Sequence, residues 1–178
     1  VAITDMVPPA ISNATVQMPD GKITHLDLAD GVMYMDKIPA AGSGGIMNYT
    51  ISNPHGSRSF LVHLPDGTKA WLNAESSLTY PVQFMHQRIV EVEGEVYFEV
   101  RHIDNKSFTV LGNGTEIKVL GTHFNVNTHG GATKVTLLEG AVQVKHDNDT
   151  KLLQPGQAAI AGAGLIVERA DTVSVMAW

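Results

Sequence analysis

Short runs of alternating apolar and polar residues, separated by tight-turn sequences, make up most of this 178-residue chain. Val, Ile, Thr, Phe and Tyr fill runs of about four to eight residues, and Asp-Gly, Asn-Gly and Pro-Gly pairs stand between them. The segments Trp71 to Thr79 and Gln154 to Ala163 have room for a helical turn, but their serines and glycines disfavour a longer helix. The pattern predicts an all-β fold of many short antiparallel strands, arranged as a two-sheet sandwich, a jelly roll or a β-solenoid.

The clearest strand pattern runs from Val90 to Val100, with the sequence VEVEGEVYFEV. Apolar residues occupy the even positions, and Gly94 falls among them, where a missing side chain permits a bend. The odd positions carry the glutamates Glu91, Glu93, Glu95 and Glu99. We expect one long bent strand, or two collinear ones, with these glutamates on one face. Such a stripe is commonly just solvated, but it is also our candidate docking surface for a basic partner.

Two sequence echoes share one offset. The turns MPDG and LPDG place Asp20 and Asp66 46 positions apart, and the Glu-Gly steps place Glu93 and Glu139 at the same separation. Turn dipeptides recur in any β protein, but two equal offsets favour an internal repeat of strand-turn units.

Charge and composition narrow the range of partners. The chain carries 12 Lys and Arg against 18 Asp and Glu, a formal net charge of −6, and no basic cluster, so we expect no nucleic-acid partner. It has no cysteine, so disulfides and thiolate metal sites are excluded. No apolar run approaches the roughly 20 residues of a membrane span, and no signal-peptide pattern is present. Because it begins at Val1 and stops abruptly at Trp178, we expect a piece of a longer protein.

Motifs for catalysis or cofactor binding are missing from the sequence. The eight histidines include His123, His129 and His146, but no pair has the two-residue or four-residue spacing that places two ligands on one face. A metal-binding cupin would need a second histidine two residues after His123, where this chain has Asn125. There is no Gly-x-Ser-x-Gly motif and no phosphate-binding glycine loop. We therefore expect no enzyme activity, no cofactor and no metal.

Several motifs between Pro54 and Gln157, taken in order, resemble the FecR-like periplasmic domain of bacterial membrane-bound anti-sigma factors, especially the Bacteroidetes form. They are LPDGTKAWLNAESSLTYP, RIVEV followed by EGEVYFEV, KSFTV, VLGTHFNVN, VTLLEGAVQV and LLQPGQ. The turns at 54–58 and 101–104 depart from the family pattern, so contacts made by those loops do not carry over. We expect residues 1–50 to be a β-rich lead-in and residues 51–178 the FecR-like core, together forming one structural unit.

The resemblance implies a signal relay across the inner membrane. The periplasmic part would receive a signal from the N-terminal signalling domain of a TonB-dependent outer-membrane transporter loaded with an iron chelate or a glycan. A cytoplasmic segment absent from this chain would bind an extracytoplasmic-function sigma factor, and a transmembrane helix, also absent, would provide the only membrane contact. The closing residues 175–178 resemble the start of a segment that leads to a further C-terminal domain.

Two other functions stay open at the level of sequence. An extracellular carbohydrate-binding or adhesive module would use Trp71 as a stacking platform if its ring is exposed, although large aromatic side chains usually bury most of their area. An assembly protein would pair its exposed strand edges with a neighbouring molecule. Binding to transporter signalling domains would distinguish the anti-sigma hypothesis from the carbohydrate-binding and assembly hypotheses.

Overall fold

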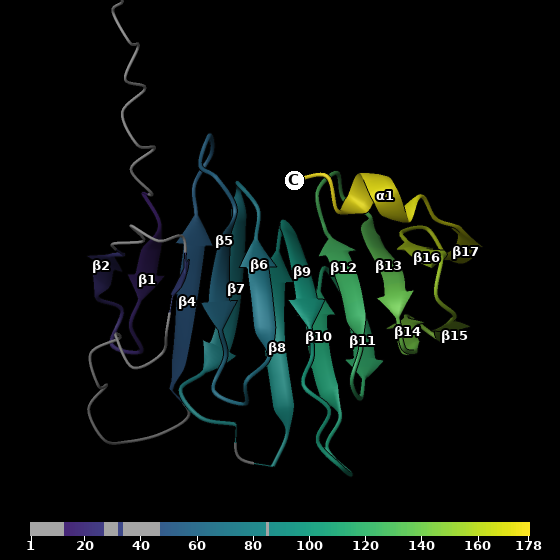
Figure 1. Cartoon of the computed structure of the whole chain (residues 1–178), viewed down its shortest axis with the longest axis horizontal. Helices are drawn as coiled ribbons and strands as arrows, with labels where there is room; N and C mark the ends of the chain where they lie inside the picture. Colours follow the sequence, from purple (N-terminus) through teal and green to yellow (C-terminus); the bar gives the residue numbers. More distant parts are fainter. Residues whose placement is uncertain (1–12, 27–31, 34–46, 85) are drawn as a thin grey trace, which may run out of the picture.

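The computed structural model describes residues 13–26, 32–33, 47–84 and 86–178, which form two β-sheets that enclose one core (Figure 1). The nine-stranded sheet, called sheet A, contains β1 (Thr15–Gln17), β2 (Ile23–His25), β4 (Asn48–Asn53), β7 (Ser76–Pro81), β8 (Arg88–Glu93), β10 (Phe108–Gly112), β11 (Thr115–Val119), β14 (Val142–His146) and β15 (Asp149–Leu153). The eight-stranded sheet, called sheet B, contains β3 (Val32–Met33), β5 (Phe60–His63), β6 (Lys69–Leu72), β9 (Glu95–Glu99), β12 (His123–Asn127), β13 (Thr133–Glu139), β16 (Gln157–Ala161) and β17 (Leu165–Arg169). The prediction of an all-β fold in two sheets is confirmed.

Successive segments of the chain alternate between the two sheets. Hairpin β5–β6 lies in sheet B and β7–β8 in sheet A; hairpins β10–β11, β12–β13, β14–β15 and β16–β17 continue the alternation. The sandwich therefore grows in one direction along the sequence, which Figure 1 shows as a steady change of colour across the molecule. Most pairs are antiparallel, but β8 and β10 are parallel because β9, between them in sequence, lies in the opposite sheet.

The core lies between the sheets and is made by the apolar half of each alternating strand. In β8 the burial pattern alternates strictly, so that Val90 and Val92 point inward while their neighbours face solvent. At the centre, Phe98 stacks on Phe124 with ring centroids 5.3 Å apart and contacts Phe108 at 5.8 Å. These three rings are fully buried and join strands of both sheets, so they fix the spacing between the layers.

The prediction of collinear strands with all four glutamates on one face is wrong. Gly94 adopts φ +88° and sends the chain from β8 in sheet A to β9 in sheet B. A side chain there would meet Ser76 Oγ at 2.4 Å and the Glu75 carbonyl oxygen at 2.5 Å, so glycine is required at this crossing. The inward parity is preserved on both sides, and the outward residues consequently lie on opposite outer faces of the sandwich.

The 46-residue echoes correspond to matching local structures. In both PDG turns the glycine N–H donates to the carbonyl oxygen of Met18 or Leu64, at 2.8 and 3.0 Å. In each turn the aspartate Oδ1 also accepts from the backbone N–H two residues later, at 2.9 Å. The first turn joins strands of sheet A and the second joins strands of sheet B. Likewise, Gly94 marks a crossing from A to B and Gly140 (φ +94°) a crossing from B to A.

The helical content differs from the prediction. Residues 71–79 and 154–163 contain strand and turn, and the described residues form one short helix, α1 (Thr172–Val175). The Asp171 carboxylate caps it by accepting from the N–H groups of Val173 and Ser174 at 3.1 and 3.3 Å. Within the described ranges no helix has the length and apolar character to cross a bilayer. Strand β1 pairs with β4, but the domain boundary at residue 50 stays a prediction.

Candidate functional site

The motif LPDGT builds a turn whose aspartate faces inward. Asp66 Oδ1 accepts from the backbone N–H of Thr68 at 2.9 Å, and Oδ2 accepts from the Thr68 hydroxyl at 2.8 Å. Oδ2 also accepts from Arg88 Nη1 at 2.8 Å, in an ion pair whose side chains are only 2% (Arg88) and 4% (Asp66) exposed. A charge buried this deeply is tolerated only when it is paired and hydrogen-bonded, so the turn and the first residue of β8 depend on one another.

Arg88 joins three further loop segments. Its Nη1 donates to the carbonyl oxygen of Arg101 at 2.7 Å, and its Nη2 donates to the carbonyl oxygens of Lys106 and Leu120, the latter at 3.3 Å. The guanidinium also lies 5.4 Å from the centre of the Phe108 ring. We call Arg88 and Asp66 the clasp, because they hold several loops together. Both residues belong to motifs of the sequence, but the motifs did not predict their interaction. The partners of Arg88 lie 13 to 32 residues away from it in sequence.

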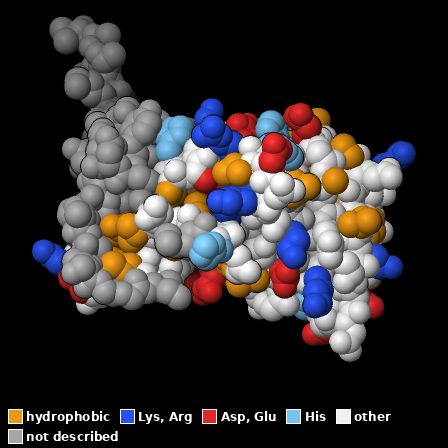
Figure 2. All heavy atoms as spheres, turned by 90° about the horizontal axis from the view of Figure 1, so that it is seen from below, with side chains coloured by type: hydrophobic (Ala, Val, Ile, Leu, Met, Phe, Trp, Pro, Cys, Tyr) orange, Lys and Arg blue, Asp and Glu red, His pale blue; other side chains and the backbone are white. Residues whose placement is uncertain are grey.

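Charged side chains at one end of the sandwich are mixed in sign. Figure 2 shows this end, with Lys and Arg interspersed among Asp and Glu on the visible face. Mixed charge of this kind offers no strong field of either sign to an approaching partner. The two outer faces of the sheets are therefore better candidates for a docking surface than this end.

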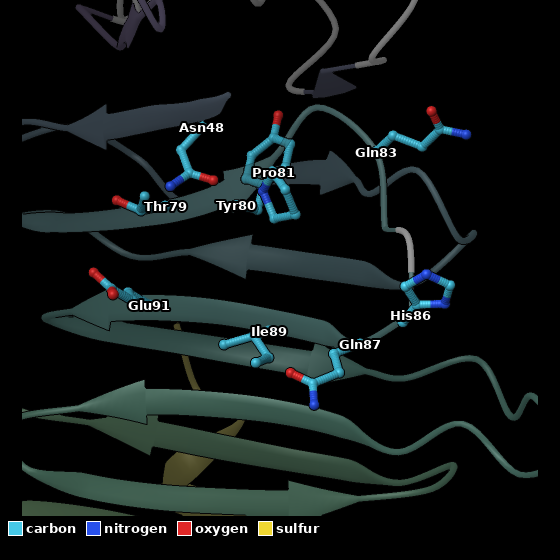
Figure 3. Close-up of a pocket in the computed structure, with 9 residues that line it drawn as sticks. All are labelled: Asn48, Thr79, Tyr80, Pro81, Gln83, His86, Gln87, Ile89 and Glu91. Atoms are coloured by element: carbon cyan, nitrogen blue, oxygen red, sulfur yellow. The ribbon is translucent and has the colours of Figure 1, made fainter. Parts of the chain in front are cut away.

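The outer face of sheet A carries a groove of about 530 Å³ over β4, β7 and β8 (Figure 3). Its lining residues are Asn48, Thr79, Tyr80, Pro81, Gln83, His86, Gln87, Ile89 and Glu91. Amides, a hydroxyl, an imidazole and one carboxylate surround Ile89, which is 37% exposed. These groups offer both donors and acceptors around an apolar contact, which suits a polypeptide surface. Glu91 was a candidate from the sequence. The other lining residues were not, because alternation shows which residues face outward but not where an outer face is hollowed.

The four candidate glutamates have different surroundings. Glu91 and Glu93 are exposed on the outer face of sheet A. On sheet B, Glu95 accepts from Asn73 Nδ2 at 3.1 Å and from Asn125 Nδ2 at 2.9 Å, and Glu99 interacts with a tyrosine side chain on its own strand. Only Glu91 and Glu93 keep the arrangement that the stripe hypothesis requires, two fully exposed carboxylates on one face. Their role in partner binding stays a prediction.

An aromatic pair occupies the outer face of sheet B. Trp71 of β6 lies opposite Tyr97 of β9, with ring centroids 5.4 Å apart and planes inclined at 43°. Trp71 is half-buried and lies outside the core, so its ring is partly accessible. Burial, followed by the negative charge and hydrogen bond of Glu99, raises the pKa of Tyr97 to about 12.

His123 and His146 each contact a different polar side chain and do not contact one another. His123 Nδ1 lies 3.3 Å from Glu139 Oε2, and His146 Nδ1 lies 3.0 Å from the Thr115 hydroxyl. Within the part of the chain that the structure describes, no group of three or more His, Cys, Asp or Glu side chains is placed to hold a metal ion. The outer faces of the two sheets are surfaces that a partner can contact, and the buried polar cluster around Arg88 holds loops of the fold together.

Residues 49–143 match the family model described as FecR protein. The chain belongs to the FecR family. Two crystal structures of a protein from Parabacteroides distasonis ATCC 8503, provisionally assigned as an anti-sigma factor, are each 34% identical in sequence. They superpose with TM-scores of 0.69 and 0.68 over 74% and 72% of this chain.

The FecR match confirms the resemblance predicted from the motifs. The chain spans only 64% and 63% of the lengths of the two crystallised chains. No curated protein matches it. The matched region contains the clasp, the aromatic pair on sheet B and every lining residue of the groove on sheet A except Asn48.

Proposed function

We propose that this chain is the signal-receiving periplasmic part of a membrane-bound anti-sigma factor. The FecR match over residues 49–143 carries the proposal, and the 34% identity to a protein provisionally assigned as an anti-sigma factor supports it. Sheets closed by a buried core give a rigid surface, and signal reception needs only a difference in affinity between two states of a partner. The chain would act without making or breaking covalent bonds.

The incoming partner in this proposal is the N-terminal signalling domain of a TonB-dependent outer-membrane transporter engaged in iron or glycan uptake. The outgoing partner is an extracytoplasmic-function sigma factor, bound by a cytoplasmic segment outside this chain. A transmembrane helix outside this chain would tether the domain to the inner membrane. The support for these steps is the family resemblance of the motifs, and each needs its own test.

We assign the docking surface to the outer face of sheet A. Glu91 lines the groove and Glu93 lies two residues further along the same exposed face. The exposed carboxylates of Glu91 and Glu93 would steer a basic patch of the partner, and docking would then cover the apolar surface of Ile89. The formal net charge of −6 also favours a positively charged partner.

The experiment measures binding of the purified chain to signalling domains of TonB-dependent transporters from the same genome. The variant Glu91→Lys/Glu93→Lys should weaken the cognate complex about tenfold at low salt and flatten its salt dependence. The matched control Glu139→Lys/Glu168→Lys reverses two charges on sheet B and should bind as the wild type does. Absence of binding by any signalling domain would contradict the relay. Equal binding by both double variants would instead move the interface away from sheet A.

A carbohydrate-binding module is the second candidate, because Trp71 is partly accessible on an outer face. Aromatic rings can stack on the apolar faces of sugars. Titration with a glycan panel, followed by tryptophan fluorescence, tests this directly. An unchanged spectrum across the panel would remove the carbohydrate reading and leave the anti-sigma proposal standing.

A further inference from the structure

A second pocket lies on sheet B, on the outer face opposite to the groove. It has a volume of about 240 Å³ and is lined by Trp71, Tyr97, Glu99, Val175, Met176 and Trp178. Strands β6 and β9 supply its floor. The last residue of α1 and the residues after it supply one wall. Residues more than 70 positions apart in sequence therefore build one small site.

Aromatic surface dominates this pocket. The Trp71 and Tyr97 rings meet at an angle of 43°, and Trp178, 36% exposed, lines the same space. The face of each ring carries partial negative charge, so several rings around one space attract a cation. A neutral apolar ligand would gain the contact area but none of this attraction.

One carboxylate in the pocket lacks a cationic partner. Glu99 is half-buried and lies on the same strand as Tyr97, whose pKa its negative charge helps to raise. In the described part of the chain no Lys, Arg or His nitrogen lies within 4.0 Å of the Glu99 carboxylate, although Lys69 and His123 are its cross-strand neighbours. His123 pairs instead with Glu139. A partly desolvated carboxylate of this kind is stabilised by an incoming positive charge.

We propose that this pocket receives a single arginine side chain of a partner protein. The planar guanidinium can stack on Trp71 or Trp178 while it donates two hydrogen bonds to Glu99, a combination that a lysine ammonium cannot match. The volume suits one long side chain. This site adds to the docking surface on sheet A and does not depend on the anti-sigma proposal, since it is defined by its own residues on the other face.

The chain offers a direct readout of the site. Its only two tryptophans, Trp71 and Trp178, both line the pocket, so intrinsic tryptophan fluorescence reports on this place alone. The probe is a blocked Gly-Arg-Gly tripeptide. Its matched control replaces arginine with citrulline, which has nearly the same shape and no charge. Sodium chloride keeps the ionic strength constant throughout the titration.

The arginine peptide should give a saturable fluorescence change with a dissociation constant on the order of 1–10 mM, as a single desolvated cation contact implies. The citrulline peptide should bind at least about tenfold more weakly, and Glu99→Gln should weaken arginine binding by a similar factor. Trp71→Phe should retain part of the binding and Trp71→Ala should lose most of it. Glu116→Gln, in β11 on the opposite sheet, changes an equally half-buried glutamate and should bind as the wild type does.

Several results would overturn this assignment. Equal binding of both peptides, or unchanged binding by Glu99→Gln, would remove charge recognition. A neutral glycan that shifts the fluorescence more strongly than the arginine peptide would turn the pocket into a sugar site. No saturable change with the arginine peptide up to about 50 mM would remove the arginine site. If circular dichroism shows that Trp71→Ala is unfolded, Glu99→Gln and Trp71→Phe still decide the question.

Discussion

The segment from Val90 to Val100 contains two halves with one sequence pattern and two different outcomes. In the β8 half the outward glutamates are exposed to solvent, whereas in the β9 half both are half-buried and Glu95 is held by two amides. Alternation decides which residues point outward in both halves. The neighbouring strands decide what those residues meet, and these neighbours differ because Gly94 places the halves in opposite sheets.

The largest effect should come from the residue that anchors the start of β8. We expect Arg88→Ala to lower the free energy of unfolding by about 5 kcal/mol, because it leaves Asp66 buried without its cation and frees several carbonyl acceptors. Urea denaturation measures the change. Arg101→Ala, a change at an exposed position beside the same turn, should cost less than about 0.5 kcal/mol. A similar loss in both variants would contradict a special role for the clasp.

The junction between the two halves should be the next most sensitive position. Gly94→Ala introduces a Cβ within 2.4 Å of Ser76 Oγ at a positive φ, so we expect a loss of about 3–4 kcal/mol. Gly114→Ala is the matched control: its φ is +74° and no atom lies within 4 Å of the added Cβ, so it should cost about 1 kcal/mol. Thermal unfolding measures the stability loss in each variant. Both variants carry the strain of a positive φ, and only Gly94→Ala adds steric overlap. Equal losses would mean that the close approach to Ser76 has no cost of its own.

The contrast between the glutamates can be sharpened with two isosteric changes. Glu95→Gln turns one acceptor into a donor that faces the amide donors of Asn73 and Asn125, and we expect a loss of about 1–1.5 kcal/mol. Glu93→Gln on the exposed half should stay within about 0.5 kcal/mol of the wild type. Chemical denaturation of both proteins under identical conditions provides the comparison. Equal stability of the two variants would show that the amides contribute nothing to Glu95.

The smallest effect concerns alkaline pH. Folded Tyr97 has its pKa raised to about 12, so above pH 10 the unfolded chain loses its phenol proton first and stability falls as pH rises from about 10 to 12. Burial raises the pKa of Tyr80 too, which adds to the fall. Between pH 8 and 10.5 the share due to Tyr97 should be below about 1 kcal/mol. Tyr97→Phe should show the shallower decline, and parallel curves for the two proteins would contradict this origin.

The sequence was a good guide to what is local. The PDG turns, the inward valines of β8 and the FecR motifs were all predictable, because each depends on residues close together in the chain. The crossing at Gly94 was not, since a bend that keeps the inward parity looks the same as a straight strand in the sequence. The pairing of Arg88 with Asp66, and the pocket that Trp71 and Trp178 both line, depend on long-range packing that alternation does not encode.

Hairpins that alternate between sheets have a consequence for how the molecule loses its structure. Each described strand pairs only with its immediate neighbours in the order of its sheet, so the first and last hairpins share no hydrogen bonds. Stability in such an array is close to a sum over neighbouring units. Hydrogen exchange should therefore reveal separate opening free energies at the two ends, with the slowest amides near the phenylalanine stack in the middle.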